Sequence, residues 1–351
     1  MINSFEITNF RCFQHLPPVA LRRFNIIVGD SGSGKTSLIE ALFLSAGASP
    51  EIYLRLRAWR GFGAALSLTV TKDAYESIFR DLFYDFRQEL GAKISCPDTS
   101  GGARNVEIKY EKKSEYDLPL EGIGQNAFIV DPIVFEWEVA GKLYRSALEI
   151  KENKLVVSGT APVSPLVFLS PAVREASSQN AISFSSLSKK FRGNLLTDAV
   201  SKLFPEVKDI TIEMLAGEAV LYINSGLAEK LPIADISGGI NKFVSIALAI
   251  LTNPGGTVLV DEIESGFYYQ KLPEVWRALV DLASVRDVQC QLIVTTHSYE
   301  FLTAASKSLS DDQIASDTLL LRLEKSGGEH SVKRIKAPAF HSAIDAGLEV
   351  R

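Results

Sequence analysis

The sequence contains few cysteines and histidines, no long hydrophobic run and no excess of basic charge. Its 351 residues include three cysteines and four histidines. Cys12, Cys96 and Cys290 are widely spaced and form no C-x-x-C pair, so the sequence predicts neither a disulfide framework nor a zinc site. The 37 basic side chains face 42 acidic ones, and a formal charge of −5 gives no general attraction to nucleic acid. Any contact with nucleic acid would therefore depend on a local patch.

No apolar stretch approaches the ~20 residues that a membrane-spanning helix requires. The longest candidates, residues 244–251 and Thr257–Val260, are interrupted by Asn253 and Pro254 and by Asp261. The first six residues have neither the basic region nor the apolar core of a signal peptide. We therefore expect a cytoplasmic protein without a membrane partner.

The order of the apolar segments predicts an α/β fold. A short apolar run at Phe24–Val28 suits a buried strand, and the periodic apolar residues that follow it suit a helix. Alternation of helices and strands in the last third is typical of a parallel sheet covered on both faces. The segments in that third are predicted helices at 241–251, 271–285 and 299–306 and predicted strands at Thr257–Val260 and Gln291–Thr295.

The middle of the chain has a different pattern. Residues 51–90 are predicted to be mostly helical, and alternating segments such as 106–110 and 134–139 predict antiparallel strands. We expect them to form a lobe inserted after the first helix. The serine-rich stretch Ser177–Ser188 predicts a surface connection. The expected division of the chain is residues 1–48, 49–165 and 166–351.

The strongest motif lies between the predicted strand Phe24–Val28 and the helix after it. It matches G-x-x-x-x-G-K-[ST], the P-loop or Walker A pattern. Glycines let backbone N–H groups turn toward phosphate oxygens, and the following helix presents its positive N-terminal end. We expect Lys35 to neutralise the β- and γ-phosphates of ATP and Thr36 to bind magnesium. The predicted ATP-binding residues of this loop are Gly29, Asp30, Ser31, Gly32, Ser33, Gly34, Lys35, Thr36 and Ser37.

A second motif follows a later predicted strand. The apolar segment Thr257–Val260 ends in two carboxylates, Asp261 and Glu262, which is the form of a Walker B strand. Ligands bind at the carboxyl edge of the strands in α/β folds, so we expect Asp261 to hold magnesium together with Thr36. Glu262 is the predicted catalytic base, which polarises the water that attacks the terminal phosphate.

Two further motifs flank this strand in the sequence. A Ser-Gly-Gly motif precedes a periodic apolar helix, where a hydroxyl and free backbone amides favour an anion site; its residues are Ser237, Gly238 and Gly239. The same residue types at 100–102 lead into a predicted strand, so we expect a hairpin turn there. His297 follows the predicted strand Gln291–Thr295, on the same edge as Asp261, and is the one histidine to which we assign a functional role.

In this order, the P-loop, the Ser-Gly-Gly motif, the Asp-Glu pair and His297 resemble the ATP-binding cassette (ABC) ATPases of the RecF, SMC and OLD branch. The resemblance covers roughly residues 1–48 and 195–310. Residues 236–240 resemble the cassette signature, with isoleucine in place of the usual leucine and glutamine. The resemblance implies an ABC-ATPase head with a mainly parallel P-loop core sheet, an antiparallel β lobe and an inserted helical segment, using ATP and Mg²⁺.

The resemblance also implies roles that the motif chemistry does not. Residues 7–13 resemble this branch, in which the arginine matched by Arg11 lies near the nucleotide phosphates, so Arg11 joins the predicted ATP-binding residues. In the family, the signature of one subunit completes the nucleotide site of the other, which implies that Ser237 acts in trans in a homodimer closed by ATP. His297 matches the switch histidine beside the catalytic Glu262. Residues 170–174 are the candidate for the Q-loop role.

Within the branch, residues 261–266 and 295–298 are closest to OLD-like AAA-family ATPases of bacterial and phage defence. RecF typically has aspartate at the position of Glu262 and lacks the histidine. OLD-like members usually have His-Pro where this chain has residues 267–269, Phe-Tyr-Tyr. Many also continue into a TOPRIM nuclease domain, but only 54 residues follow His297, so we expect no nuclease in this chain.

Three functions remain open. The first is an ATPase that gates a separate nuclease or toxin effector in antiviral defence, the second a DNA-binding ATPase of repair or recombination, and the third a transporter subunit. Two basic clusters do not choose between them, because either could contact phosphates and stack on a base, while solvated helix faces are the simpler interpretation. The clusters are Arg55, Arg57 and Arg60 around Trp59, and Lys189, Lys190 and Arg192 around Phe191.

Overall fold

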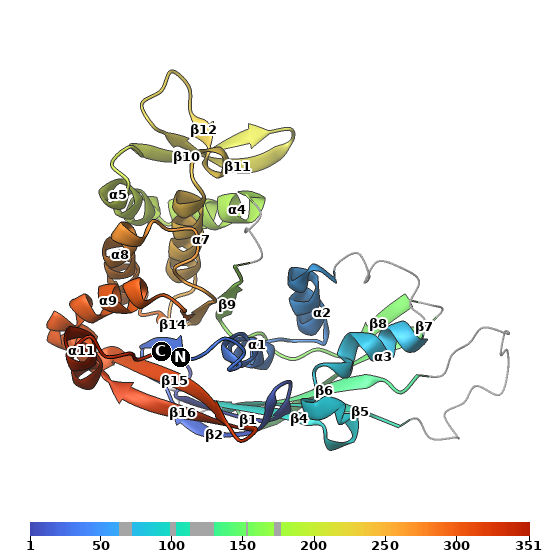
Figure 1. Cartoon of the computed structure of the whole chain (residues 1–351). Coiled ribbons are helices and arrows are strands. Elements are labelled where there is room, and N and C mark those ends of the chain that lie inside the picture. Colours follow the sequence, from blue (N-terminus) through green and yellow to red (C-terminus); the bar gives the residue numbers. More distant parts are fainter. Residues whose placement is uncertain (63–71, 99–102, 113–129, 152–153, 172–176) are drawn as a thin grey trace.

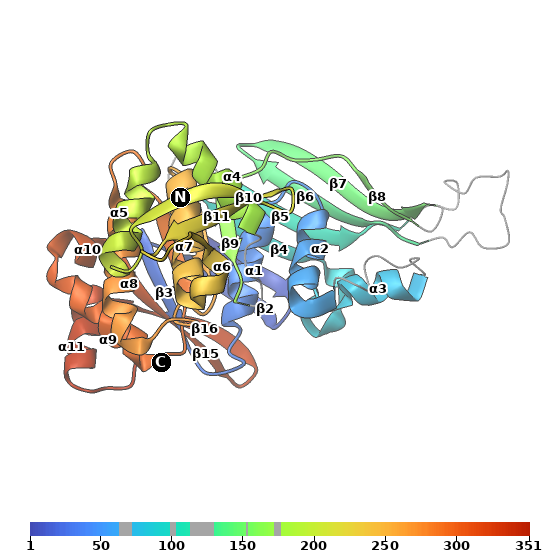
Figure 2. The same ribbon diagram turned by 90° about the horizontal axis from the view of Figure 1, so that it is seen from above.

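The computed structural model describes residues 1–62, 72–98, 103–112, 130–151, 154–171 and 177–351. These residues form three sheets and the helices around them (Figure 1). Two of the sheets form the body of the molecule, and helix α1 (Lys35–Ser45) packs on strands of both. The third sheet lies at the far end of the helices that cover the core sheet (Figure 1), and from above it is seen in front of them (Figure 2).

The core sheet has six strands in the order β16-β15-β3-β14-β13-β9. Central strand β3 pairs in parallel with β14 and β15, and β13 pairs in parallel with β14 and β9. Edge strand β16 is antiparallel to β15. This confirms the mainly parallel core sheet. The strands are β3 (Phe24–Val28), β9 (Leu166–Leu169), β13 (Thr257–Val260), β14 (Gln291–Thr295), β15 (Thr318–Ser326) and β16 (Glu329–Lys336).

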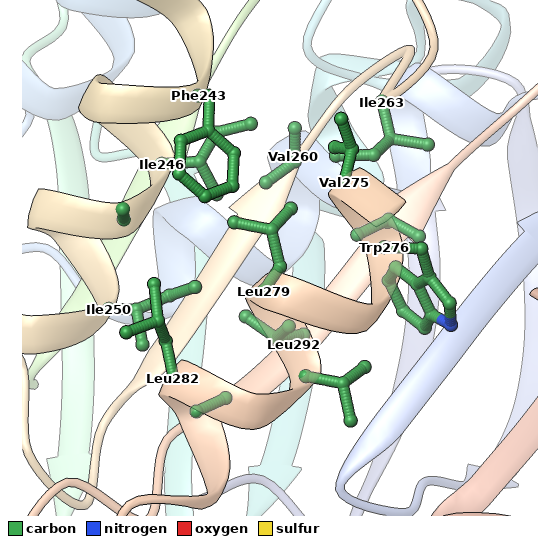
Figure 3. Packing of buried hydrophobic residues seen from close by; sticks show 14 of the residues in the cluster. Phe243, Ile246, Ile250, Val260, Ile263, Val275, Trp276, Leu279, Leu282 and Leu292 are labelled. Carbon is green, nitrogen blue, oxygen red and sulfur yellow. The ribbon is translucent and has the colours of Figure 1, made fainter. Parts of the chain in front are cut away.

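Both faces of the core sheet are buried, which explains its continuous apolar strands. In β3, Ile26 and Val28 join one hydrophobic cluster and Ile27 the other, because successive side chains point to opposite faces. On the first face lie α7 (Gly238–Thr252), α8 (Leu272–Ser284) and α9 (Tyr299–Lys307). Figure 3 shows side chains of α7 and α8 packed over Val260 and Leu292 of the sheet.

The second face of the core sheet packs against α1 and the antiparallel sheet beyond it. This sheet has the order β2-β1-β4-β5-β6-β7-β8, so strands from residues 49–165 extend the sheet that the N-terminal strands begin. Helices α2 (Glu51–Arg57) and α3 (Lys72–Arg80) lie on the same side of it as α1 (Figure 1). The strands are β1 (Ser4–Phe10), β2 (Phe13–Ala20), β4 (Ala92–Pro97), β5 (Ala103–Tyr110), β6 (Ile133–Val139), β7 (Lys142–Lys151) and β8 (Lys154–Ser158).

The serine-rich stretch is a helix, α4 (Ser177–Ser188), so the predicted surface connection is wrong. Its buried residues Ala181, Phe184 and Leu187 recur every third position and pack into the core, and this spacing outweighs the weak helix propensity of serine. Helix α5 (Gly193–Leu203) follows, and α4 packs on the three-stranded sheet formed by β10 (Asp209–Leu215), β11 (Glu218–Asn224) and β12 (Leu231–Pro232).

Two helices follow α9 in the last part of the chain. Asp311 caps the short helix α10 (Asp312–Asp317) by accepting bonds from two backbone N–H groups. Helix α11 (Ala337–Asp345) follows β16 and buries Phe340 completely. The predicted turn at 100–102 lies outside the described residues.

Arg104 joins the antiparallel sheet to the end of α1. It lies on β5, is 8% exposed, and donates to the carbonyl oxygens of Gly47 at 2.5 Å, Ala46 at 3.3 Å and Pro162 at 2.6 Å, and also to that of Ser45. Because the last carbonyls of a helix lack partners and carry partial negative charge, this buried cation stabilises the C-terminus of the helix that follows the P-loop. No described helix is long and apolar enough to cross a membrane.

Candidate functional site

Three adjacent strands of the core sheet bring the motifs together at one edge. Strand β3 leads into the P-loop, β13 into Asp261 and Glu262, and β14 into His297. The three strands are parallel, so their carboxyl ends meet at the same edge, where α/β folds bind ligands. Residues more than 200 positions apart thereby form one site.

The P-loop conformation depends on glycine at two positions. Gly29 has φ 147°, and a Cβ there would clash with the carbonyl oxygen of Leu323 on β15. Gly34 has φ 103°, and its Cβ would lie 2.8 Å from the sulfur of Cys12, next to Phe13. Glycine is therefore needed at Gly34 for two reasons. Its positive φ disfavours other residues, and the turn after β1 packs so closely on the P-loop that there is no space for a side chain.

Lys35 lies against the backbone of its own loop. Its Nζ donates to the carbonyl oxygens of Gly29 at 2.6 Å and Asp30 at 3.0 Å, and the residue is 5% exposed. Burial lowers the pKa of Lys35, and the carboxylates of Asp261 and Asp30 oppose that shift. The lysine is thus a desolvated cation surrounded by carbonyls, ready to exchange them for phosphate oxygens.

Asp261 connects the P-loop to the neighbouring strand. Its Oδ2 accepts from the Thr36 hydroxyl at 3.0 Å and its Oδ1 from the Thr295 hydroxyl at 2.5 Å. Asp261 is 4% exposed, so the carboxylate is held by two hydroxyls in a nearly dry position. The two predicted metal ligands, Thr36 and Asp261, are therefore in direct contact.

Glu262 is held in a strained backbone conformation. Its φ is 49°, a region that non-glycine residues rarely adopt. The Glu262 N–H donates to the Thr295 hydroxyl at 2.8 Å, and its carbonyl oxygen accepts from Lys242 Nζ at 2.7 Å. Contacts on both sides thus fix the position from which the predicted catalytic base acts.

Lys242 is a site residue that the sequence reasoning missed. It lies in the second turn of α7, and besides Glu262 its Nζ contacts the Ser265 carbonyl at 2.8 Å and hydroxyl at 3.1 Å. Burial lowers the pKa of Lys242 to about 8, although three carboxylates oppose the shift, led by Glu264. Its one signal in the sequence is that it is the single charged residue of the mostly apolar helix after the Ser-Gly-Gly motif.

His297 follows β14 in a loop that is held at its backbone. The His297 N–H donates to Glu264 Oε1 at 2.8 Å, and its carbonyl oxygen accepts from Arg351 at 3.1 Å. Its side chain is exposed on the same edge as Asp261. Glu264, which anchors this loop, is a second residue whose role the sequence reasoning did not identify.

The Ser-Gly-Gly motif lies at the N-terminus of α7. Ser237 has an extended backbone, and its hydroxyl makes no capping bond to the helix. Gly238 is exposed with open space around it, whereas Gly239 packs against the Gly266 carbonyl, to which a Cβ would lie 3.0 Å away. The motif therefore places an exposed glycine and a serine hydroxyl that does not cap the helix at the N-terminus of α7.

Arg11 is buried beside α1 rather than open to the phosphate site. Its Nη1 lies 2.9 Å from Glu40 Oε2, and the two side chains are 7% and 3% exposed. Nε and Nη2 of Arg11 have no partner within the described part of the chain. Its nucleotide contact stays a prediction. Of the Q-loop candidate, Ser170 and Pro171 follow β9 and residues 172–174 lie outside the described ranges.

The Lys242 contacts give a direct prediction. Lys242→Met should lower kcat for ATP hydrolysis by about tenfold or more with little change in nucleotide affinity, because misplacing a catalytic group is costly and Lys242 bonds to the Glu262 loop, not to the P-loop. Separate measurement of kcat and nucleotide Kd tests it. Lys230→Met is the matched control, since Lys230 is an exposed lysine paired with Glu213. An unchanged kcat in Lys242→Met would contradict the role.

Comparison with known proteins agrees with this geometry. A family model described as "AAA domain, putative AbiEii toxin, Type IV TA system" matches residues 24–303, about four fifths of the chain. An "ATP/GTP phosphatase" of Helicobacter pylori is 21% identical over 353 residues, with 93% of both chains covered.

Shorter matches involve "DNA replication and repair protein RecF". The Thermomicrobium roseum protein is 52% identical over 46 residues, covering 13% of this chain and 12% of that protein. The Idiomarina loihiensis protein is 29% identical over 148 residues, 39% of each. Among solved structures, the SMC head domain from Thermotoga maritima has a TM-score of 0.45 at 14% identity, covering 95% of this chain and 99% of that one.

Family match and motif order lead to the same assignment. The matched residues contain the P-loop, the Ser-Gly-Gly motif, the Asp-Glu pair and His297, in that order. In the structure, the first, third and fourth of these meet at one edge of a mainly parallel sheet. The chain belongs to this AAA-domain family and is an ABC-type P-loop ATPase.

Proposed function

We propose that this ATPase works as an ATP-closed, head-to-tail homodimer that gates a separate effector in antiviral defence. The observation that carries the proposal is the hydrogen-bonded series from Thr36 through Asp261 and Thr295 to the backbone of Glu262. It joins the nucleotide-binding loop to the residue positioned for hydrolysis. In the same chain, Gly238 of the Ser-Gly-Gly motif is exposed and Ser237 is half-buried, so we expect each chain to offer a second half-site to a partner.

Three side chains of the site have separate roles in ATP hydrolysis. Lys35 leaves the carbonyls of Gly29 and Asp30 to neutralise the terminal phosphates. Glu262 accepts a proton from the attacking water, and its backbone is already fixed by Thr295 and Lys242. His297 extends from the same edge and orients the terminal phosphate. Because these groups are held before substrate arrives, little reorganisation is needed at the moment of reaction.

The residues present fit a magnesium ion. Mg²⁺ prefers oxygen ligands, and the Thr36 hydroxyl and an Asp261 carboxylate oxygen lie 3.0 Å apart in a buried position. When bound there, the ion would neutralise charge on the β- and γ-phosphate oxygens. Thr295 would keep the Asp261 carboxylate oriented through its second oxygen.

The dimer model predicts a separation of binding from hydrolysis in a Ser237→Arg variant. ATP affinity should stay close to that of the native chain, because Ser237 lies at the start of α7, outside the P-loop. Hydrolysis and ATP-induced dimerisation should be lost, because a long cation would occupy the contact that the motif offers to the partner's phosphates. Light scattering with and without ATP measures dimerisation and calorimetry measures ATP affinity, with Ser186→Arg, at an exposed position of α4, as control. Native turnover in Ser237→Arg would count against the in-trans site.

The family description names a toxin and a type IV toxin–antitoxin system, which supports a defence setting. We propose a cytoplasmic complex in which the effector is a separate nuclease or toxin, docked on the segment 49–165 between the two parts of the ATPase core, 1–48 and 166–351. Isolation of the native complex tests this directly and should recover that second protein. The purified chain with magnesium or manganese should leave DNA and RNA intact. Cleavage that is lost on mutating acidic residues other than Asp261 and Glu262 would contradict the separate effector.

The RecF relatives favour a second candidate, a DNA-binding ATPase of repair or recombination. In that case ATP closure would clamp DNA and hydrolysis would release it. DNA-stimulated ATP hydrolysis by the purified chain, with no second protein in the native complex, would support this candidate over the first. Recovery of an integral membrane protein would instead support a transporter subunit.

A further inference from the structure

The structure separates the two basic clusters that the sequence presents with aromatic residues. In the first, Arg57 Nη1 lies 2.8 Å from Asp81 Oδ2, and Arg60 donates two bonds of 2.8 Å to the buried Glu40. The ring of Trp59 packs 5.4 Å from that of Phe43. Two of the three arginines in this cluster are paired with carboxylates and its aromatic ring is packed, so the cluster has less free charge to offer an outside partner.

The second cluster is the turn 189–192 between α4 and α5, and it is open. Phe191 is 95% exposed, and Lys189 and Lys190 beside it are exposed as well. No ion pair joins Lys189, Lys190 or Arg192 to a carboxylate among the described residues. In a chain with a formal charge of −5, this turn gathers three cations around one aromatic ring.

The backbone conformation of this turn is unfavourable for phenylalanine. The Arg192 N–H donates to the Leu187 carbonyl and the Phe191 N–H to the Ser188 carbonyl, both at 3.0 Å. These bonds are those of a Schellman C-cap, whose left-handed residue is usually glycine. Phe191 occupies that position with φ 56°. The residue is strained and its ring lies in water, so it contributes nothing evident to the fold.

We propose that the turn 189–192 binds single-stranded nucleic acid, with Phe191 stacking on a base and the three flanking cations contacting phosphates. A flat, fully exposed ring between cations matches the alternation of base and phosphate along a strand. The strand is single because the faces of bases in a duplex are already stacked. This binding site lies outside the P-loop and goes beyond the ATPase function. Its helix α4 still contacts α7, the helix after the Ser-Gly-Gly motif, because the Asn180 amide donates to the Ser245 hydroxyl at 2.9 Å.

Fluorescence anisotropy with the full chain tests the proposal. The probes are labelled oligo-dT and oligo-U of about 20 nucleotides and a duplex of the same length, at several salt concentrations. Phe191→Ala should weaken single-strand binding about tenfold and leave duplex binding unchanged. A triple variant should show a weaker dependence on salt; it combines Lys189→Gln, Lys190→Gln and Arg192→Gln. The slope of log K for the single strand against log salt should become shallower by about 2, since each phosphate contact contributes about 0.7. Leu143→Ala and Lys142→Gln, at the exposed start of β7, are the matched controls and should change neither value.

Phe191→Gly separates binding from folding. Glycine adopts the left-handed conformation without strain, so the thermal midpoint should rise by about 2 °C while single-strand binding falls as in Phe191→Ala. ATP affinity should be unchanged in both variants. The proposal is overturned if the native chain does not bind the single strands at low salt, if Phe191→Ala binds them as tightly as the native chain, or if an acidic peptide such as poly-glutamate competes for the turn better than oligo-dT.

Discussion

Glu262→Gln should bind ATP about as tightly as the native chain and lower kcat by at least a hundredfold. Glutamine keeps the size of the side chain, and its backbone can keep the bonds to Thr295 and Lys242, but an amide cannot accept the proton of the attacking water. Loss of a general base typically costs two to four orders of magnitude in rate, and a hundredfold corresponds to about 2.7 kcal/mol of barrier. The rate of phosphate release at saturating ATP measures kcat, and calorimetry measures the affinity for ATP.

The same variant tests the closed dimer, because ATP that is not hydrolysed should hold two chains together. Light scattering of Glu262→Gln should therefore show the mass of two chains with ATP and the mass of one chain without it. Glu274→Gln is a suitable control, since Glu274 is an exposed carboxylate paired with Lys271 on α8 and should turn over normally. Unchanged turnover in Glu262→Gln would place the base elsewhere. A loaded variant that stays monomeric would require another subunit to supply the signature.

Lys35→Ala should reduce ATP affinity by about a hundredfold or more. Lys35 is the cation that the P-loop brings to the terminal phosphates, and it is 5% exposed, so its charge is little screened by water. Removing one member of a desolvated, hydrogen-bonded charge pair costs about 2–5 kcal/mol. The lost bonds to Gly29 and Asp30 involve only the loop, so the core should remain folded.

Calorimetry gives the affinity of Lys35→Ala, and thermal unfolding shows whether the fold survives. Lys109→Ala is the control, because Lys109 is a partly exposed lysine whose contact with Glu136 lies on the antiparallel sheet. Its ATP affinity should equal that of the native chain. Native affinity in Lys35→Ala, with an intact unfolding transition, would refute the assignment of this loop as the phosphate site.

Much of the core was predictable from local pattern. The limits of β3 and β13 agree with the apolar runs that predicted them, and the predicted strand Gln291–Thr295 is β14. Strands of a doubly covered sheet are mostly apolar, and β3, β13 and β14 are each followed by loop residues that carry chemistry, so the change in composition marks where these three strands end. Helix α4 was not predicted although its buried residues recur every third position, because its many serines have weak helix propensity.

The contacts that position the site were not predictable in the same way. Lys242 reaches Glu262 across 20 positions, Glu264 reaches His297 across 33, and Arg11 pairs with Glu40 on α1. None of these partners is neighbouring in sequence or set by helix or strand periodicity. Each depends on which strands lie side by side and on how a loop after one strand meets the start of a helix.

The kind of chemistry can be inferred from the sequence, because the P-loop, Asp261 and Glu262 carry their function in residue type and spacing along short segments of backbone. The packing of the folded chain sets which side chains hold that chemistry in place and which basic cluster is available to a partner. Trp59 and Phe191 both lie among basic residues in the sequence, yet the ring of Trp59 packs against Phe43 and that of Phe191 lies in water. Burial and ion pairing are properties of the packed chain, and they depend on distances that no local pattern specifies.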